Sequence, residues 1–419
     1  MGRLPARNHG KNCACDNTWR CTKGAAERPG STAAGVRNRR RVSDASQATG
    51  PLAGLRVVEL AGIGPAPFCA MLLADMGAQV LRIAPPPQGP PAFPIPEHED
   101  PMWRGRSRLT LDLKDARQRA RLLRILAHAE VLIEGFRPGI IEKLGIGPDV
   151  CLALNPRLVI GRMTGWGQSG PLSQAPGHDP NYIALTGALH AIGHSGAPPC
   201  PPLNLVGDFG GGALYLAVGI LAAILHVRAG GAGQVIDAAM IDGASSLMTM
   251  IYALRNRGLW EDRRGANLLD GGCPFGSTYE TADGKYVAVC ALEPPFYRAL
   301  LAALGLDERS LPPQHERSGW PLLRQRFAAV FRTRTRDEWT RLLEGSEACV
   351  TPVLTLAEAP RHPHNLARGV FVGAPPVPAA APRFSVTPTA HAPQRGPETA
   401  ELLARWGMRE DEARELTEP

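Results

Sequence analysis

From residue 50 onward, short apolar runs alternate with longer segments whose apolar residues recur every three or four positions. The runs are typical of buried strands and the longer segments of helices. Strands that alternate with helices favour an α/β fold, in which helices cover both faces of a parallel, Rossmann-like sheet. The predicted strands are Leu55–Leu60, Gln79–Ile83, Leu109–Leu113, Val131–Gly135, Leu158–Met163 and Val235–Met240, and the main predicted helices are Pro67–Met76, Asp115–Ala129, Gly210–Val227 and Ile241–Arg255.

The segment Gly210–Val227 is largely apolar throughout, so it allows two interpretations. Its length is close to the minimum for a helix that spans a membrane. Asp208 just before it and the α/β pattern on both sides favour a helix buried in the core of a globular domain. We therefore predict a core helix and no membrane association.

The pattern changes character near residues 265–275. An Asp283-Gly284 pair lies between the short runs Tyr279–Glu280 and Lys285–Cys290, which is typical of a β-hairpin. A helix at Glu293–Leu304, two further helices and a strand at Val350–Leu354 follow. We predict a large α/β domain over residues 49–265, a smaller α+β domain over 266–355, and a C-terminal segment, 356–419, that returns to the large domain. Residues 371–394 are Pro-rich and are predicted to lack regular structure.

The formal net charge of +7 comes from the N-terminus. Residues 1–48 hold ten basic and three acidic side chains, so the rest of the chain is electrically balanced. A balanced domain has no basic surface for nucleic acid. The first 48 residues lack hydrophobic periodicity and an apolar signal-peptide core, and we predict a disordered basic tail. A basic binding arm is the alternative.

The chain has 9 cysteines, an odd number, and several lie in apolar surroundings. This usage is typical of reduced thiols in a cytoplasmic protein. Cys13, Cys15 and Cys21 have no fourth ligand at zinc-finger spacing, so no metal is predicted. The Gly62-x-Gly64 turn lacks the third glycine and the later acidic residue of a dinucleotide site, so NAD is not expected either.

Two motifs carry candidate chemistry: Gly177–Tyr182, which contains His178, and Asn204–Gly212, which contains Asp208. A neutral base and a protonated acid on opposite sides of a carbon would move a proton from one face to the other, which is racemase chemistry. The helix that follows Asp208 favours its ionised form, whereas burial favours its neutral form, and we expect burial to dominate once a bound substrate excludes water. A structural histidine and a turn-forming aspartate are the alternative interpretations.

Further motifs occur in order along residues 51–400: Leu55–Glu59 with Gly62–Pro67, Asp112–Lys114, Glu134–Gly139, Arg162–Gly167, Pro202–Gly212 and Arg264–Gly272. Together with the histidine motif they resemble the family III CoA-transferases (the CaiB/BaiF superfamily), and within it the α-methylacyl-CoA racemase branch. The resemblance implies an interlocked homodimer that epimerises (2R)- and (2S)-2-methylacyl-CoA thioesters. The implied enzyme is an isomerase of fatty acid and lipid metabolism that uses two-base α-proton transfer through an enolate. No separate cofactor is implied, because the substrate carries coenzyme A.

The resemblance also assigns roles to residues. His178 and Asp208 fall on the two catalytic positions, Glu293 matches an acidic residue that assists the histidine, and the backbone N–H of Asp179 is implied to stabilise the enolate oxygen. The implied CoA site consists of Leu111, Asp112, Leu113, Lys114, Gly135, Phe136, Arg137, Lys143, Gly177 and Tyr182. Pro85 stands where the family usually has an arginine, so the cationic candidates for the CoA phosphates are Arg104, Arg106, Lys114, Arg137 and Lys143.

Two other functions remain open at this point. In a family III CoA-transferase, an aspartate at the position of Asp179 would be the nucleophile. A non-catalytic binder of CoA thioesters is the second alternative. It is allowed by Pro85 in place of the family's arginine and by Lys143, which stands where a close relative would have arginine. The joint presence of His178, Asp208 and Glu293 favours the racemase. The predicted partners are an acyl-CoA thioester and a second copy of the chain, with no nucleic acid and no membrane.

Overall fold

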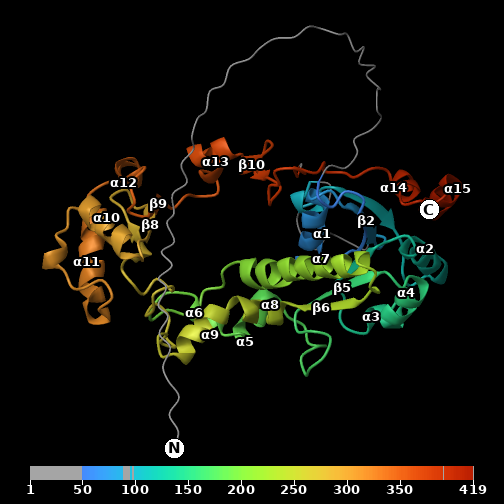
Figure 1. Cartoon of the computed structure of the whole chain (residues 1–419), viewed down its shortest axis with the longest axis horizontal. Coiled ribbons are helices and arrows are strands. Elements are labelled where there is room, and N and C mark those ends of the chain that lie inside the picture. The colour runs from blue at the N-terminus through green and yellow to red at the C-terminus, as the bar shows by residue number, and fades with distance from the viewer. Residues whose placement is uncertain (1–49, 88–94, 97–98, 390, 419) are drawn as a thin grey trace, which may run out of the picture. The chain divides into compact units, whose positions relative to one another are not determined.

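The structure is a computed structural model that describes residues 50–87, 95–96, 99–389 and 391–418 (Figure 1). The predicted tail over residues 1–48 lies outside the described residues, as do Cys13, Cys15 and Cys21. The predictions made for that segment therefore stay predictions.

Six parallel strands form the main sheet, as the alternating pattern predicts. They are β1 (Arg56–Leu60), β2 (Gln79–Ala84), β3 (Arg106–Thr110), β4 (Val131–Glu134), β5 (Val159–Thr164) and β6 (Val235–Ala239). Their order across the sheet is β3-β2-β1-β4-β5-β6, and all neighbours run parallel. The chain changes direction across the sheet between β1 and β4. In open α/β sheets, ligands bind beyond the carboxyl ends of the strands at this point.

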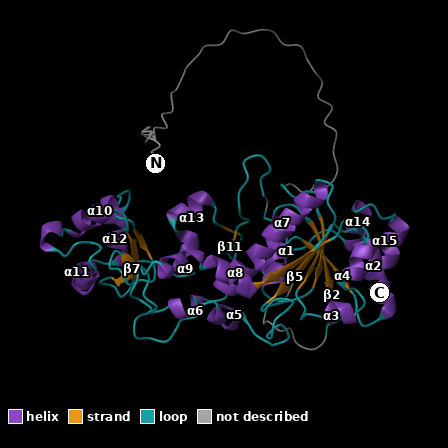
Figure 2. Ribbon diagram, turned by 60° about the horizontal axis from the view of Figure 1, so that its bottom comes forward, coloured by secondary structure: helices purple, strands orange, loops and turns teal. Residues whose placement is uncertain are grey.

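Helices cover both faces of the sheet (Figure 2). Alternate residues of β1 point to opposite faces, so Val57 packs in one core and Val58 in the other. The first core contains α1 (Pro65–Asp75) and α7 (Leu214–Arg228). The second contains α2 (Ala116–Leu126), α3 (Ile140–Lys143), α4 (Pro148–Leu154), α14 (Thr399–Arg405) and α15 (Glu410–Thr417).

The long apolar helix belongs to the core of this domain. It begins as a π-helix over Leu205–Ala213 and continues as α7. By length and composition alone Leu205–Arg228 would be able to cross a membrane. However, Leu216 and Ile220 are fully buried against the sheet, as predicted for a core helix. The helix starts before the predicted Gly210. Asp208 and the glycines around it interrupt the apolar pattern, so the pattern does not show where the helix begins.

Two further predicted elements were wrong in detail. The third strand is Arg106–Thr110 rather than Leu109–Leu113, because the charged Arg106 is buried in the strand and forms an ion pair with Glu59 at 3.0 Å. The predicted helix over residues 241–255 consists of two helices, α8 (Met240–Leu247) and α9 (Thr249–Asn256). They meet at Met248, whose ψ of 1° departs from helical geometry.

The second half of the chain contains a separate antiparallel sheet, as predicted. Its strands are β7 (Gly276–Glu280), β8 (Tyr286–Cys290) and β9 (Val350–Pro352), in that order. Gly284, with a φ of 70°, occupies the hairpin turn between the first two. The helices α10 (Pro294–Leu304), α11 (Trp320–Phe331) and α12 (Arg336–Leu343) complete an aromatic core.

The chain also contains shorter elements outside the two sheets and their covering helices. They are α5 (Asp179–Leu185), α6 (Ala188–Ala191), α13 (Pro363–Arg368) and the strand pair β10 (Phe371–Val372) and β11 (Val377–Pro378). The strand pair is a small exception to the irregular structure predicted for residues 371–394. The domain boundaries given above stay predictions.

Close packing fixes the π-helix against α8. A Cβ atom added to Gly211 would lie 2.6 Å from the backbone nitrogen of Ala244, and one added to Gly243 would overlap the carbonyl oxygen of Gly211. Glycine is therefore required at both positions because two backbones approach each other directly. This contact sets the position of the segment that carries Asp208.

We predict that Gly243→Ala destabilises the protein by about 1–3 kcal/mol or more, because backbone atoms cannot move aside as a flexible side chain would. Gly62→Ala is the matched control, since a Cβ there meets no atom of the described residues within 4 Å. Denaturant unfolding of both variants measures the difference. Equal stability of the two variants would contradict the proposed packing constraint.

Candidate active site

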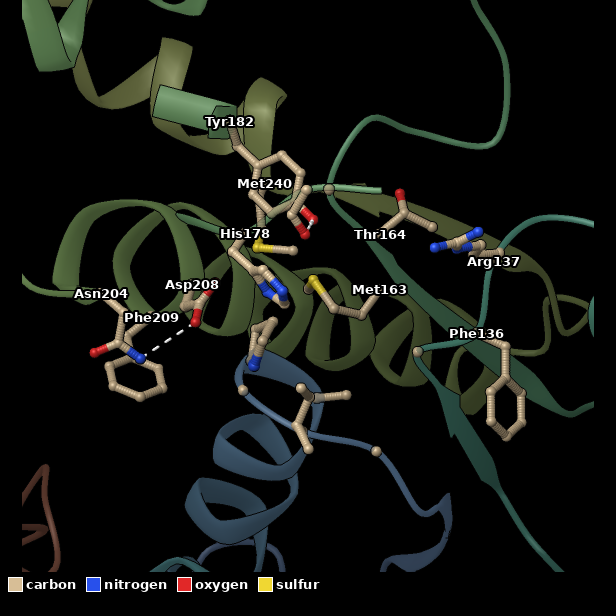
Figure 3. Close-up of a pocket in the computed structure, with 18 of the residues that line it drawn as sticks. Phe136, Arg137, Met163, Thr164, His178, Tyr182, Asn204, Asp208, Phe209 and Met240 are labelled. Atoms are coloured by element: carbon tan, nitrogen blue, oxygen red, sulfur yellow. Dashed lines mark hydrogen bonds between the residues drawn. The ribbon is translucent and has the colours of Figure 1, made fainter. Parts of the chain in front are cut away.

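A cavity of about 880 Å³ opens at the carboxyl ends of the central strands. Its walls come from the residues after β1 (Gly62–Ala66), β4 (Gly135–Pro138) and β5 (Gly165–Trp166), and from Met240 at the end of β6. This is the position that the strand order predicts for a ligand site. Figure 3 shows His178 and Asp208 in the same part of the cavity, with Phe136 and Arg137 at another part of its wall.

His178 is placed by the start of α5. It is the last residue before the helix, and its backbone N–H donates to the side-chain oxygen of Asn181 at 3.0 Å. Tyr182, one turn into the helix, donates its hydroxyl to the carbonyl oxygen of Gly177 and packs edge-on against Trp166. The backbone on both sides of His178 is therefore fixed, with the imidazole on the cavity wall.

Asp208 lies in the π-helix, a rare conformation that is frequent at functional sites. Its carboxyl group accepts a hydrogen bond from the side-chain nitrogen of Asn204 at 3.2 Å (Figure 3). Burial raises the pKa of Asp208 and the negative charge of Asp179 raises it further, whereas the Asn204 hydrogen bond and His178 lower it. The net shift is upward, and burial is its largest cause.

Asp179 is buried beside these two residues, with 2% of its surface exposed. Its Oδ2 atom accepts a hydrogen bond from the backbone N–H of Asp208 at 2.7 Å. A Cβ on Gly207 would lie 2.6 Å from the same oxygen, so only glycine fits there. The Asp179 side chain is not part of the cavity wall. Asp179 therefore joins the His178 segment to the Asp208 segment at a point outside the cavity wall.

The structure brings together half of the residues singled out from the sequence. Those that line the cavity are Gly135, Phe136, Arg137, Gly177, His178, Tyr182 and Asp208, and those that do not are Leu111, Asp112, Leu113, Lys114, Lys143, Asp179 and Glu293. Leu111 is buried in the second core, and Glu293 is an exposed residue before α10 in the antiparallel-sheet region. The functional roles of all these residues stay predictions.

A buried ion pair holds the loop that carries Arg137. Arg162 on β5 donates to Glu134 at the end of β4 at 2.7 Å, and also to Glu142 at 2.7 Å. The second oxygen of Glu134 accepts the backbone N–H of Phe136 at 2.8 Å. This network orders the turn after β4 and presents Arg137 to the cavity.

The sequence analysis missed several cavity residues. Arg82, in the middle of β2, lines the cavity and lies 4.0 Å from the ring centroid of Trp103, which also lines it. Asn204 and Met163 were not assigned to the site either. A charged residue within a strand predicted to be fully buried was the one available signal for Arg82, because such a charge requires a partner or a ligand.

Two cations that we considered for the CoA phosphates have other partners. Arg104 donates to Asp75 at 2.8 Å, and Arg106 forms the ion pair with Glu59. Both arginines are almost completely buried. They support the fold and are not available to a ligand. Among the described residues, no cluster of three or more His, Cys, Asp or Glu side chains is arranged to hold a metal ion.

Residues 52–401 match CoA-transferase family III. The chain is 44% identical over 372 residues to the α-methylacyl-CoA racemase of Mus musculus, which covers 87% of this chain and 96% of that protein. It is 43% identical, with the same coverage, to the α-methylacyl-CoA racemase of Homo sapiens. The crystal structure of a CaiB/BaiF family protein from Brucella suis superposes with a TM-score of 0.68 at 26% identity, and the match covers 84% of this chain and 96% of that one.

We predict that Asp208→Asn stabilises the folded protein at neutral pH. The pKa of Asp208 is higher in the folded than in the unfolded chain, so ionisation favours unfolding, and stability falls as the pH rises from the unfolded to the folded pKa. The asparagine side chain does not ionise, so the variant does not lose this stability. The gain should disappear as the pH is lowered toward about 4, the ordinary pKa of aspartate.

Asp283→Asn is the control of opposite sign. A hydrogen bond from Thr281 and the backbone N–H of Arg336 lower the pKa of Asp283, so its ionised form stabilises the fold above the unfolded pKa. This variant should lose stability at neutral pH. Thermal unfolding of both variants across pH measures the effect, and a destabilised Asp208→Asn protein at neutral pH would contradict the proposed environment of Asp208.

Proposed function

Because the chain belongs to CoA-transferase family III, we propose that its cavity binds 2-methylacyl-CoA thioesters and interconverts their (2R) and (2S) forms. The observation that carries this proposal is the pair formed by His178 and Asp208. Both line one cavity, and burial raises the pKa of Asp208 above its ordinary value. One base and one acid are what a proton transfer between two faces of a carbon requires.

The reaction proceeds in two steps. Neutral His178 removes the α-proton of the thioester, and the electron pair moves into the carbonyl to form an enolate. Protonated Asp208 then donates its proton to the opposite face of the α-carbon, which gives the other enantiomer. The reverse turnover starts with ionised Asp208 and protonated His178. Donors directed at the enolate oxygen lower the barrier, and the backbone N–H of Asp179 is our candidate for this role.

The remainder of the cavity fits a CoA thioester. Arg137, on the loop after β4, supplies a cation for a phosphate group, while Phe209 and Met240 supply apolar surface near the two proton-transfer residues. Phe209 stacks on Phe68 with ring centroids 4.4 Å apart, so its position is fixed. The substrate provides coenzyme A itself, and the proposed steps use only side chains of the protein.

The position of Asp179 argues against acyl transfer. A transferase nucleophile must attack a carbonyl carbon in the cavity, but the Asp179 carboxylate is buried and accepts the backbone N–H of Asp208. The side chain is also absent from the cavity wall, so either carboxylate oxygen would have to move before it could reach a bound thioester. The racemase relatives agree with this conclusion.

The direct test is the incubation of each enantiomer of a 2-methylacyl-CoA with the protein in D₂O. Deuterium should enter at the α-carbon, and both samples should approach a 1:1 mixture without any added acid acceptor. His178→Ala should lower the rate by at least about 10²-fold, the usual scale for loss of a general base. His194→Ala is the matched control, since this exposed histidine lies outside the cavity.

Two results would reject the proposal. One is the absence of exchange from either enantiomer. The other is transfer of the acyl group to an added carboxylic acid without racemisation, which would restore the transferase alternative.

We also propose that the protein is a homodimer. Large apolar side chains are exposed along α7 and α9, among them Val218 (66%), Leu225 (69%) and Met250 (57%). Several large apolar side chains exposed on neighbouring turns of a helix are typical of an interface. Glu293 lies outside the cavity of its own chain. In a dimer with interlocked chains, the partner's Glu293 would be free to approach His178.

Val218→Asp should weaken this dimer, because it would bury a charge in an apolar interface. Val150→Asp is the control, as Val150 is 43% exposed on α4, which packs on the other face of the sheet. Light scattering should give twice the chain mass of 44.7 kDa for the unmodified protein and for the control. A single-chain mass for the unmodified protein would contradict the proposal.

A further inference from the structure

The antiparallel sheet holds two thiols on adjacent segments. Cys290 is the last residue of β8, and Cys349 immediately precedes β9. The two strands pair in the register Val287↔Pro352, Ala288↔Thr351 and Val289↔Val350, so the next opposed pair is Cys290 and Cys349. The backbone N–H of Cys290 donates to the carbonyl oxygen of Cys349 at 3.0 Å, which extends the pairing to these residues.

Both thiols are accessible. Val287, Val289 and Ala291 are buried, and Cys290 between them is exposed, as expected for alternate residues of a strand with one buried face. Cys349 is exposed as well, and both cysteines are free thiols. Residues directly opposed in antiparallel strands have Cα atoms about 4.5–5.5 Å apart. A disulfide requires about 4.4–6.8 Å, so the two residues can be joined with little backbone movement.

The surroundings of Cys349 connect the pair to Glu293. Partial burial of the sulfur raises the pKa of the Cys349 thiol, and the charges of Glu293, Cys290 and Glu347 raise it further. These groups are therefore close to its sulfur. Glu293 follows Cys290 by three residues and precedes α10. Cys349 also has a φ of 52°, an uncommon left-handed conformation for a residue with a side chain.

We propose that Cys290 and Cys349 are a reversible dithiol–disulfide pair, and that its oxidation alters the position of Glu293. A hydroperoxide is the oxidant. One thiolate attacks the peroxide O–O bond to give a sulfenic acid and water, and the second thiol attacks that sulfur and releases the second oxygen as water. The two thiols together lose two electrons and two protons, and hydrogen peroxide is reduced to two molecules of water. A dithiol reductant reverses the change.

The first test measures the bond itself and does not depend on the proposed function. The full chain is treated with hydrogen peroxide under native conditions, alkylated, digested and analysed by mass spectrometry. The expected result is a peptide that links Cys290 to Cys349 within one chain and disappears after reduction. Cys290→Ser and Cys349→Ser should each abolish it, and Cys200→Ser, a change at another exposed cysteine, should retain it.

Over-oxidation of each thiol separately, or a link between two chains, would overturn the proposed pair.

The second test measures racemisation and rests on the function proposed above. Peroxide-treated protein should lose kcat several-fold and recover it on reduction, whereas Cys290→Ser protein should keep its rate. A linked protein with unchanged kcat would overturn the coupling to Glu293. Reduced protein without racemase activity would instead refute the proposed function.

Discussion

The backbone N–H of Asp208 donates to the buried carboxylate of Asp179, and this hydrogen bond joins two segments that are 29 residues apart in the chain. Asp179 follows His178 directly and begins α5. The bond therefore fixes the two proposed proton-transfer residues relative to each other. Its geometry depends on Gly207, whose missing side chain leaves room for the carboxylate. A charge-assisted hydrogen bond in a buried site is stronger than one in water, so this contact stabilises a π-helix that would otherwise be unfavourable.

The same carboxylate also affects the chemistry of Asp208. Burial is the larger cause of its raised pKa, but the negative charge of Asp179 adds to the effect. Asn204 acts in the opposite direction through its hydrogen bond. The net effect is a raised pKa, which makes the protonated form of Asp208 easier to reach. A two-base reaction needs this, because the residue must donate a proton in one direction and accept one in the other.

The sequence was sufficient to predict the parallel sheet, the core helix, the hairpin and the two segments that carry His178 and Asp208. Apolar periodicity reports these features well, since burial of apolar faces is what determines them. Apolar periodicity was insufficient where buried charges replace apolar residues. The third strand was therefore predicted to begin at Leu109, whereas it begins at the buried Arg106. Arg82 was missed for a related reason, because its aromatic neighbour Trp103 comes from a segment outside the strand. Asn204 lies in the same segment as Asp208, but nothing in the apolar pattern singles out its side chain as a hydrogen-bond donor. Glu293 was assigned to the site by resemblance, and the structure of one chain does not place it on the cavity wall.

The central claim is that His178 and Asp208 act on opposite faces of one carbon. It is tested most directly by α-hydrogen exchange in D₂O with His178→Asn and Asp208→Asn, each supplied with a single enantiomer. The account predicts that each variant loses racemisation but still exchanges the α-proton of one enantiomer, and that the two variants retain opposite ones. Loss of exchange from the same enantiomer in both variants would show that the two residues act on one face and would contradict the account.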